Sequence, residues 1–201
     1  MDHSTAPLKK AILYLLPPGS PKSDGIRAIL QKMDVATADL PVSMLNQTLG
    51  ACFGLDGFVL DASEFNGEAP QDEVLVMYNF ADEDFQELFK LMRAASLPRI
   101  GLMAALTEHN RSWSMLSLFS ELAKERRIMA AWVRLQQAVK TAETSTATDA
   151  GQKDNEKDQA QFEFKKALGA AKAILSSNEP PAIETIQQAE ADLNRYLVPQ
   201  E

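Results

Sequence analysis

The chain has 201 residues, of which 45% are hydrophobic, 24% charged and 7% aromatic. This balance is typical of a globular protein and excludes a collagen, a coiled-coil rod and a fully disordered polymer. Lys and Arg number 20 against 28 Asp and Glu, so the formal net charge is -8. An acidic chain argues against a surface that follows nucleic-acid phosphates or binds an anionic membrane. We therefore expect no nucleic-acid partner and no membrane partner.

Cysteine and histidine are too scarce for a disulfide framework or a zinc site. The single cysteine, Cys52, cannot close a disulfide within the chain. The only histidines are His3 and His109, so the sequence cannot supply the usual four zinc ligands. The apolar run at 11–16 ends at two prolines and is too short for a signal-peptide core or a membrane span. We predict a cytoplasmic protein without metal or cofactor.

The first third of the chain predicts two strands and two helices. Residues 9–16 predict a buried strand, which a Pro-Pro-Gly-Ser-Pro loop separates from a helix with an apolar stripe at Ile26, Ile29, Leu30 and Met33. Residues 35–38 are predicted to be extended, and residues 42–49 to form a short helix ended by Gly50. The connection at 51–72 is long enough to be functional or to contain an unrecognised element.

The middle of the chain repeats this alternation more clearly. Residues 73–80 predict a strand, and three acidic residues at 82–84 then suit the start of a helix. The stripe of this helix is Phe85, Leu88, Phe89 and Met92. Residues 100–106 predict another strand, followed by a loop and a long helix from about Ser112 into the 130s. Strands alternating with helices predict an α/β layer with right-handed crossovers.

The last third differs in composition. Residues 138–157 are small, polar and charged without an apolar period, which predicts a flexible linker. Beyond it, two apolar stripes predict a helical hairpin over 158–198, whose second helix is opened by Pro180 and Pro181. Two helices of this length cannot bury both faces alone, so the hairpin must pack against the extension that carries Trp132, Val133 and Leu135, or against a partner.

These elements define the predicted fold class as α/β: a small β-α-β-α-β-α-β-α layered domain with a C-terminal helical hairpin. The α/β domain is predicted over 8–137, the linker over 138–157 and the hairpin over 158–198.

Three stretches, 40–50, 72–77 and 106–113 with the acidic residues that follow, resemble a small bacterial family, the domain of unknown function numbered 3783. The resemblance covers about residues 8–130 and is most specific in Thr107, Asn110 and Trp113, which are spaced by three. It implies a fold unit but no activity. The hairpin over 168–197 is similar to helical-hairpin modules of bacterial surface proteins.

Four residues around the last strand-to-helix junction are candidate ligand contacts: Thr107, His109, Asn110 and Trp113. Small ligands bind at the carboxyl ends of strands in open α/β sheets. Capping explains the same residues without a ligand, because Asn110 can cap the helix, Thr107 can fix the turn and Trp113 can anchor the first turn on the core. Both interpretations stay open at the level of the sequence.

No catalytic residue is predicted. His109 beside Glu108 offers an acid and a base, but adjacent side chains rarely point the same way. Ser112 lacks a nucleophile elbow, and Cys52 has no nearby basic residue in the sequence to lower its pKa. The loop at 17–20 lacks the glycine pattern of a nucleotide site, and its prolines remove N–H donors.

Two functions are favoured over a third, a hydrolase or transferase using His109, for which the sequence offers no nucleophile. The first is a non-enzymatic interaction or assembly module that binds another protein or a second copy of itself, because the hairpin needs a docking surface. The alternative is a regulatory domain that binds a small molecule in a cleft formed by 17–20, 51–72 and 107–113. That cleft cannot exist if the strand order places the loops after the first and fourth strands at opposite edges of the sheet.

Overall fold

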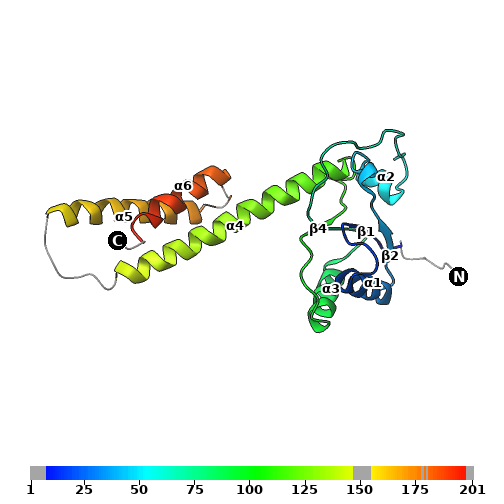
Figure 1. The fold of residues 1–201 in the computed structure, drawn as a ribbon, viewed down its shortest axis with the longest axis horizontal. Coiled ribbons are helices and arrows are strands. Elements are labelled where there is room, and N and C mark those ends of the chain that lie inside the picture. The colour runs from blue at the N-terminus through cyan, green and yellow to red at the C-terminus, as the bar shows by residue number, and fades with distance from the viewer. Residues whose placement is uncertain (1–7, 147–154, 178, 180, 198–201) are drawn as a thin grey trace. The chain divides into compact units, whose positions relative to one another are not determined.

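A computed structural model describes residues 8–146, 155–177, 179 and 181–197 (Figure 1). The chain forms two compact units, the first ending at Ala123 and the second beginning at Lys124. Helix α4 (Met115–Thr146) starts in the first unit and continues into the second.

The first unit contains a four-stranded mixed sheet of β1 (Lys10–Tyr14), β2 (Ala36–Asp39), β3 (Val74–Tyr78) and β4 (Leu102–Ala105). The strand order is β2-β1-β3-β4. Each outer strand is parallel to its inner neighbour, whereas β1 and β3 pair antiparallel at the centre. The predicted α/β class is confirmed, with helices between the strands.

Helices cover both faces of this sheet (Figure 1). On one face, α1 (Pro21–Lys32) and α3 (Asp82–Ala94) pack on alternate residues of the central strands. On the other face, α2 (Leu49–Phe53) and the first turns of α4 pack on the intervening residues. Because successive side chains of a strand point to opposite faces, a strand covered on both sides is apolar throughout, as 11–14 and 74–77 are.

The first unit is built from two halves with the same element order. The first half runs β1-α1-β2-α2 and the second runs β3-α3-β4-α4. The β1–β3 register pairs Ile12 with Val76, and the pairs on either side are symmetric about this one, Lys10 with Tyr78 and Tyr14 with Val74. The two halves are therefore related by an approximate two-fold axis through the centre of the sheet.

The same two-fold relation holds where α2 and α4 begin. An antiparallel bridge joins Thr48 to Ser114, the residues just before the two helices. Four backbone hydrogen bonds surround this bridge in symmetric pairs. They are Leu49 N to Trp113 O and Met115 N to Gln47 O, both 2.9 Å, and Gly50 N to Arg111 O and Leu116 N to Leu45 O, both 2.8 Å.

Side-chain packing follows the same symmetry. The Tyr14 and Phe119 rings lie 5.0 Å apart, and their counterparts Tyr78 and Phe53 lie 5.9 Å apart. Lys9 forms an ion pair with Asp84 at 2.6 Å, and at the corresponding position Glu73 pairs with Lys22 with the charges exchanged. Opposite charges thus occupy equivalent positions, which conceals the repeat in the sequence.

The helix predicted over 42–49 is wrong. A short 3-10 helix spans Val42–Met44, and α2 begins only at Leu49. Thr48 sets this start, because its Oγ1 accepts a hydrogen bond from Ala51 N at 3.3 Å. Gly50 lies inside α2 against the Phe58 ring, and the left-handed Gly54 ends the helix at φ 68°.

The second unit is a three-helix arrangement of α4 from residue 124 with α5 (Asn155–Leu175) and α6 (Ile183–Asn194). Its buried core joins Leu135 of α4, Ala171 of α5, and Ile186 and Leu193 of α6. The hairpin therefore packs on the extension that carries Trp132 and Leu135, whereas Val133 is exposed.

Residues 138–146, assigned to the linker from the sequence, instead form the last turns of α4. Ala138, Val139 and Ala142 are buried in the core of the second unit. They continue a helical stripe from Ala131 and Leu135, and the polar residues Gln136, Gln137, Lys140 and Thr141 between them mask its period. Residues 147–154 of the predicted linker lie outside the described residues. The compact units meet after Ala123 rather than after residue 137.

Truncating Leu135 to Ala should destabilise the second unit by about 2–5 kcal/mol, because a fully buried side chain leaves a cavity. The matched variant Val133→Ala changes an exposed residue of the same helix and should cost less than about 0.5 kcal/mol. Hydrogen exchange of α5 and α6 amides measures both. Equal effects of the two variants would contradict the packing of the hairpin on this face of α4.

The Lys9–Asp84 pair should make stability depend on pH. The Lys9 ammonium and the Ala81 N–H, both hydrogen-bonded to the Asp84 carboxylate, lower its pKa. The ionised carboxylate therefore stabilises the fold above about pH 4, the unfolded value, and this contribution is lost as pH falls through the lower folded pKa. Asp84→Asn should cost about 0.5–1 kcal/mol at pH 7 and progressively less as the pH falls below about 4.

Urea unfolding of Asp84→Asn and of the control Asp82→Asn, across this range of pH, tests the pair. Asp82 lies in the same first turn of α3 and has no ion-pair partner among the residues that the structure describes. A loss of stability at pH 2 as large as that at pH 7 would rule out the ion pair as its cause.

Candidate functional site

The loop between β4 and α4 holds the four residues singled out from the sequence. Asn110 Oδ1 accepts a hydrogen bond from Thr107 N at 2.8 Å, and Asn110 N donates to Thr107 Oγ1 at 3.4 Å. Asn110 Nδ2 also donates to Ala105 O at 3.0 Å. The side chains of Thr107 and Asn110 thus close the loop on itself and tie it to the end of β4.

His109 and Trp113 lie side by side in the same loop. Their ring centroids are 5.4 Å apart in an edge-on arrangement. His109 is exposed, while Trp113 is half-buried against the core under α2 and α4. The structure therefore brings all four residues together, and their role as ligand contacts stays a prediction.

Ser114 occupies the capping position predicted for Asn110. Helix α4 starts at Met115, and Ser114 Oγ accepts a hydrogen bond from Ser117 N at 3.0 Å. This contact corresponds to the Thr48 cap of α2 in the first half. Asn110 lies five residues before the helix, too early to reach its first N–H groups.

The cleft proposed from the sequence does not form. Its second and third walls do meet, because the Arg111 guanidinium lies 6.0 Å from the centre of the Phe58 ring. However, β1 is antiparallel to β3, and β4 is parallel to β3. The loops after β1 and β4 therefore leave the sheet at opposite ends, so 17–20 cannot line one cleft with 107–113.

The segment after α2 is held by the buried side chain of Gln47. Its Oε1 accepts a hydrogen bond from Asp61 N at 2.7 Å, and its Nε2 donates to Asp61 O at 3.0 Å and to Ser63 O at 3.2 Å. The long connection 54–73 is thus attached to the first unit through backbone groups, which gives it a structural role that the sequence does not reveal.

Cys52 and His109, the two reactive side chains considered in the sequence, lie in different surroundings. Burial raises the pKa of the Cys52 thiol to about 11, so little thiolate forms near neutrality. His109 is exposed in its loop. Among the described residues, no three His, Cys, Asp or Glu side chains are grouped to hold a metal ion.

No helix among the described residues is long and apolar enough to cross a membrane.

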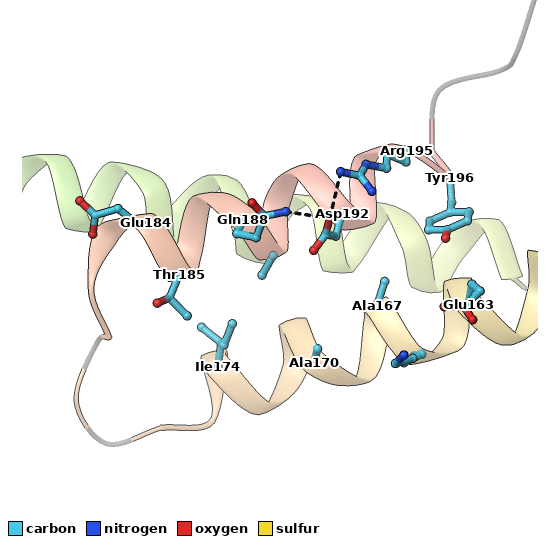
Figure 2. Close-up of a pocket in the computed structure, with 12 residues that line it drawn as sticks. Glu163, Ala167, Ala170, Ile174, Glu184, Thr185, Gln188, Asp192, Arg195 and Tyr196 are labelled. Atoms are coloured by element: carbon cyan, nitrogen blue, oxygen red, sulfur yellow. Dashed lines mark hydrogen bonds and ion pairs between the residues drawn. The ribbon is translucent and has the colours of Figure 1, made fainter.

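A groove in the second unit runs between α5 and α6 (Figure 2). Its volume is about 750 Å³. Alanines of both helices and Ile174 form its apolar part, and charged side chains of both signs surround them. The lining residues are Glu163, Lys166, Ala167, Ala170, Ile174, Glu184, Thr185, Gln188, Ala189, Asp192, Arg195 and Tyr196.

A second cavity, of about 600 Å³, lies in the first unit between α3, the following loop and β4. The lining side chains are Phe89, Met92, Arg93, Leu97, Arg99, Ile100 and Met103. They come from three elements and form no motif along the sequence, so sequence patterns alone could not identify this cavity.

The fold defines an α/β domain of two equivalent βαβα halves, followed by a helical unit. Residues 73–129 match the family described as a domain of unknown function, DUF3783. This match confirms the predicted resemblance for that segment, which begins just before β3 and ends within α4. Residues 8–72 of the predicted range lie outside the match. No curated protein and no solved structure matches the chain.

Replacing Asn110 by Ala should lower stability by about 1–2 kcal/mol, because it removes two side-chain hydrogen bonds that hold the loop. His109→Ala, in the same loop, changes an exposed ring and should cost less than about 0.5 kcal/mol. Urea unfolding of both variants measures the difference. A larger loss for His109→Ala would show that the Thr107–Asn110 hydrogen bonds do not hold the loop.

Proposed function

We propose that the protein is a non-enzymatic interaction module whose second unit binds an amphipathic helix of a partner protein. The observation that carries this proposal is the groove between α5 and α6 (Figure 2). Amphipathic helices bind in such grooves through apolar residues spaced by three or four along one face. The groove offers an apolar floor of alanines with charged side chains around it, which suits the binding of such a helix.

The shape of the groove favours a helix. Ala167 and Ala170 of α5 face Ala189 of α6 across it. Side chains this small allow a third backbone to approach closely, within the 8–10 Å between axes that is usual for packed helices. Ile174 and Tyr196, one on each of the two facing segments, add larger apolar surface.

The charges around the groove restrict the partner further. Three lining residues are acidic, Glu163, Glu184 and Asp192, and two are basic. Asp192 already contacts Arg195 at 3.4 Å and Gln188 at 2.9 Å (Figure 2). Glu184 has no such partner in the described part of the chain. We therefore expect a helix with small apolar residues on one face and Lys or Arg beside them.

A cytoplasmic, bacterial setting is part of this proposal. The single cysteine, Cys52, supports a reducing compartment, and the resemblance of the sequence to a family that we expect to be bacterial supports a bacterial source. A partner protein is favoured over self-association because the groove is acidic on balance and this chain, with net charge -8, is acidic too.

Site-specific photo-crosslinking in the full chain tests the groove. A photoreactive side chain at Ala170, in the groove, should link to one segment of a partner protein. The same side chain at Gln137, exposed on α4 outside the groove, should not. A synthetic peptide of the linked segment should become helical on binding and bind at least tenfold more weakly to Ala170→Trp than to Gln137→Trp, which is about 1.4 kcal/mol.

Equal crosslinking at the two positions would overturn the proposal, as would a linked segment that binds in an extended form. Linkage to a second copy of this chain would replace the partner with self-association. Far-UV circular dichroism of both Trp variants shows whether α5 and α4 stay folded, and the exposure of both residues leads us to expect that they do.

A further inference from the structure

The cavity between α3 and β4 combines an apolar interior with two arginines. Met92 and Ile100 are buried at 6% and 7% exposure, Leu97 and Met103 are half-buried, and Phe89 is 47% exposed. Its volume of about 600 Å³ lies within the 300–1,000 Å³ usual for small-molecule sites. Methionines adapt their shape to irregular apolar ligands.

Both arginines are available to an anion. Arg93 lies in the last turn of α3 and Arg99 in the loop before β4, and both are exposed. Neither has an ion-pair partner within the part of the chain that the structure describes, and no residue given for the cavity lining is acidic. Guanidinium groups bind carboxylates and phosphates through paired hydrogen bonds.

The loop that carries Arg99 is fixed in place. Lys22 Nζ of α1 donates a hydrogen bond to Arg99 O at 2.7 Å, and the same ammonium pairs with Glu73. Arg93 at the end of α3 also interacts favourably with the helix dipole, which accounts for its charge without a ligand. Arg99 has no comparable structural reason for its charge.

In the first half of the unit the equivalent space is closed. There α1 packs directly on β2. Arg27 of α1 donates to Leu16 O at 2.9 Å and forms an ion pair with Asp39 at the end of β2. The two-fold relation places Phe89 and Ala105 at the corresponding positions, and this pair cannot form such a contact.

The second half also has four more residues between its helix and its outer strand. Val35 N bonds to Leu30 O in the first half, and Leu97 N bonds to Met92 O in the second. The outer strand follows directly after Val35, at Ala36, but only at Leu102 in the second half. The additional residues, 98–101, include Arg99 and Ile100 and thus build one wall of the cavity.

From these differences we infer that the α3–β4 cavity binds a small amphiphilic anion, an apolar chain or ring that ends in a carboxylate or phosphate. The apolar part lies among Met92, Leu97 and Met103, and the anionic end is bound by Arg93 and Arg99 at the entrance. The site lies in the first unit and within the segment that matches the family, so it is independent of the groove between α5 and α6.

Methyl NMR of the full chain, labelled with carbon-13 at methionine methyl groups, tests this site with decanoate below its micellar concentration. The methyl signals of Met92 and Met103 should shift saturably. That of Met129, exposed on α4 in the second unit, should not. Decanol, which has no charge, should bind at least tenfold more weakly than decanoate.

Two double variants distinguish the contribution of the arginine charges to binding from that of the apolar cavity. Arg93→Gln with Arg99→Gln should weaken decanoate binding at least tenfold and leave decanol unchanged. The matched control Lys90→Gln removes a cation of α3 that pairs with Glu87 and does not line the cavity, and it should bind normally. Phe89→Arg with Ala105→Asp installs the ion pair of the first half and should prevent binding of both probes.

Four results would overturn the inference. The first three are shifts of Met129 equal to those of Met92 and Met103, equal affinity for decanol and decanoate, and full decanoate binding by the double Gln variant. The fourth is the absence of any saturable shift at millimolar decanoate. The Met92 and Met103 signals of each free variant report whether its first unit is folded.

Discussion

The antiparallel pairing of β1 with β3 is the constraint on which the first unit depends. It relates the two βαβα halves by an approximate two-fold axis near Ile12 and Val76. Equivalent helices then cover each face, and the residues that precede α2 and α4 meet at the Thr48–Ser114 bridge. The same pairing sends the loops after β1 and β4 to opposite ends of the sheet, which determines where a ligand site can and cannot form.

The sequence identifies the elements of this fold better than their arrangement. The central strands are predictable because 11–14 and 74–77 are continuous apolar runs buried on both faces. Their antiparallel pairing is not, since local patterns carry no information on how two buried strands far apart in the chain pair. The repeat escapes notice because equivalent positions hold different chemistry: Gln47 corresponds to Trp113 in the other half, and Lys9 corresponds to Glu73.

The candidate sites, too, are only partly predictable from the sequence. Thr107 and Asn110 stand out in the sequence, and the structure shows that their polar groups hold the loop after β4. The α3–β4 cavity depends on residues of three elements and on a four-residue difference that is visible only once the halves are superposed in register. The buried stripe at Ala138 and Ala142 was missed because polar neighbours mask its helical period.

The departures from the two-fold symmetry, rather than the symmetric core, create the groove and the cavity on which the two proposals rest. Helix α2 ends at Phe53 because Gly54 turns the chain, whereas α4 continues past the equivalent Phe119 to Thr146 and so supplies the helix on which α5 and α6 pack. Residues 98–101 likewise open a cavity where the first half is closed by Arg27 and Asp39. Both departures lie in the second half, which is also the part that matches the family. Both halves build the sheet and its core, and only the second half adds the four residues at 98–101 and the longer helix.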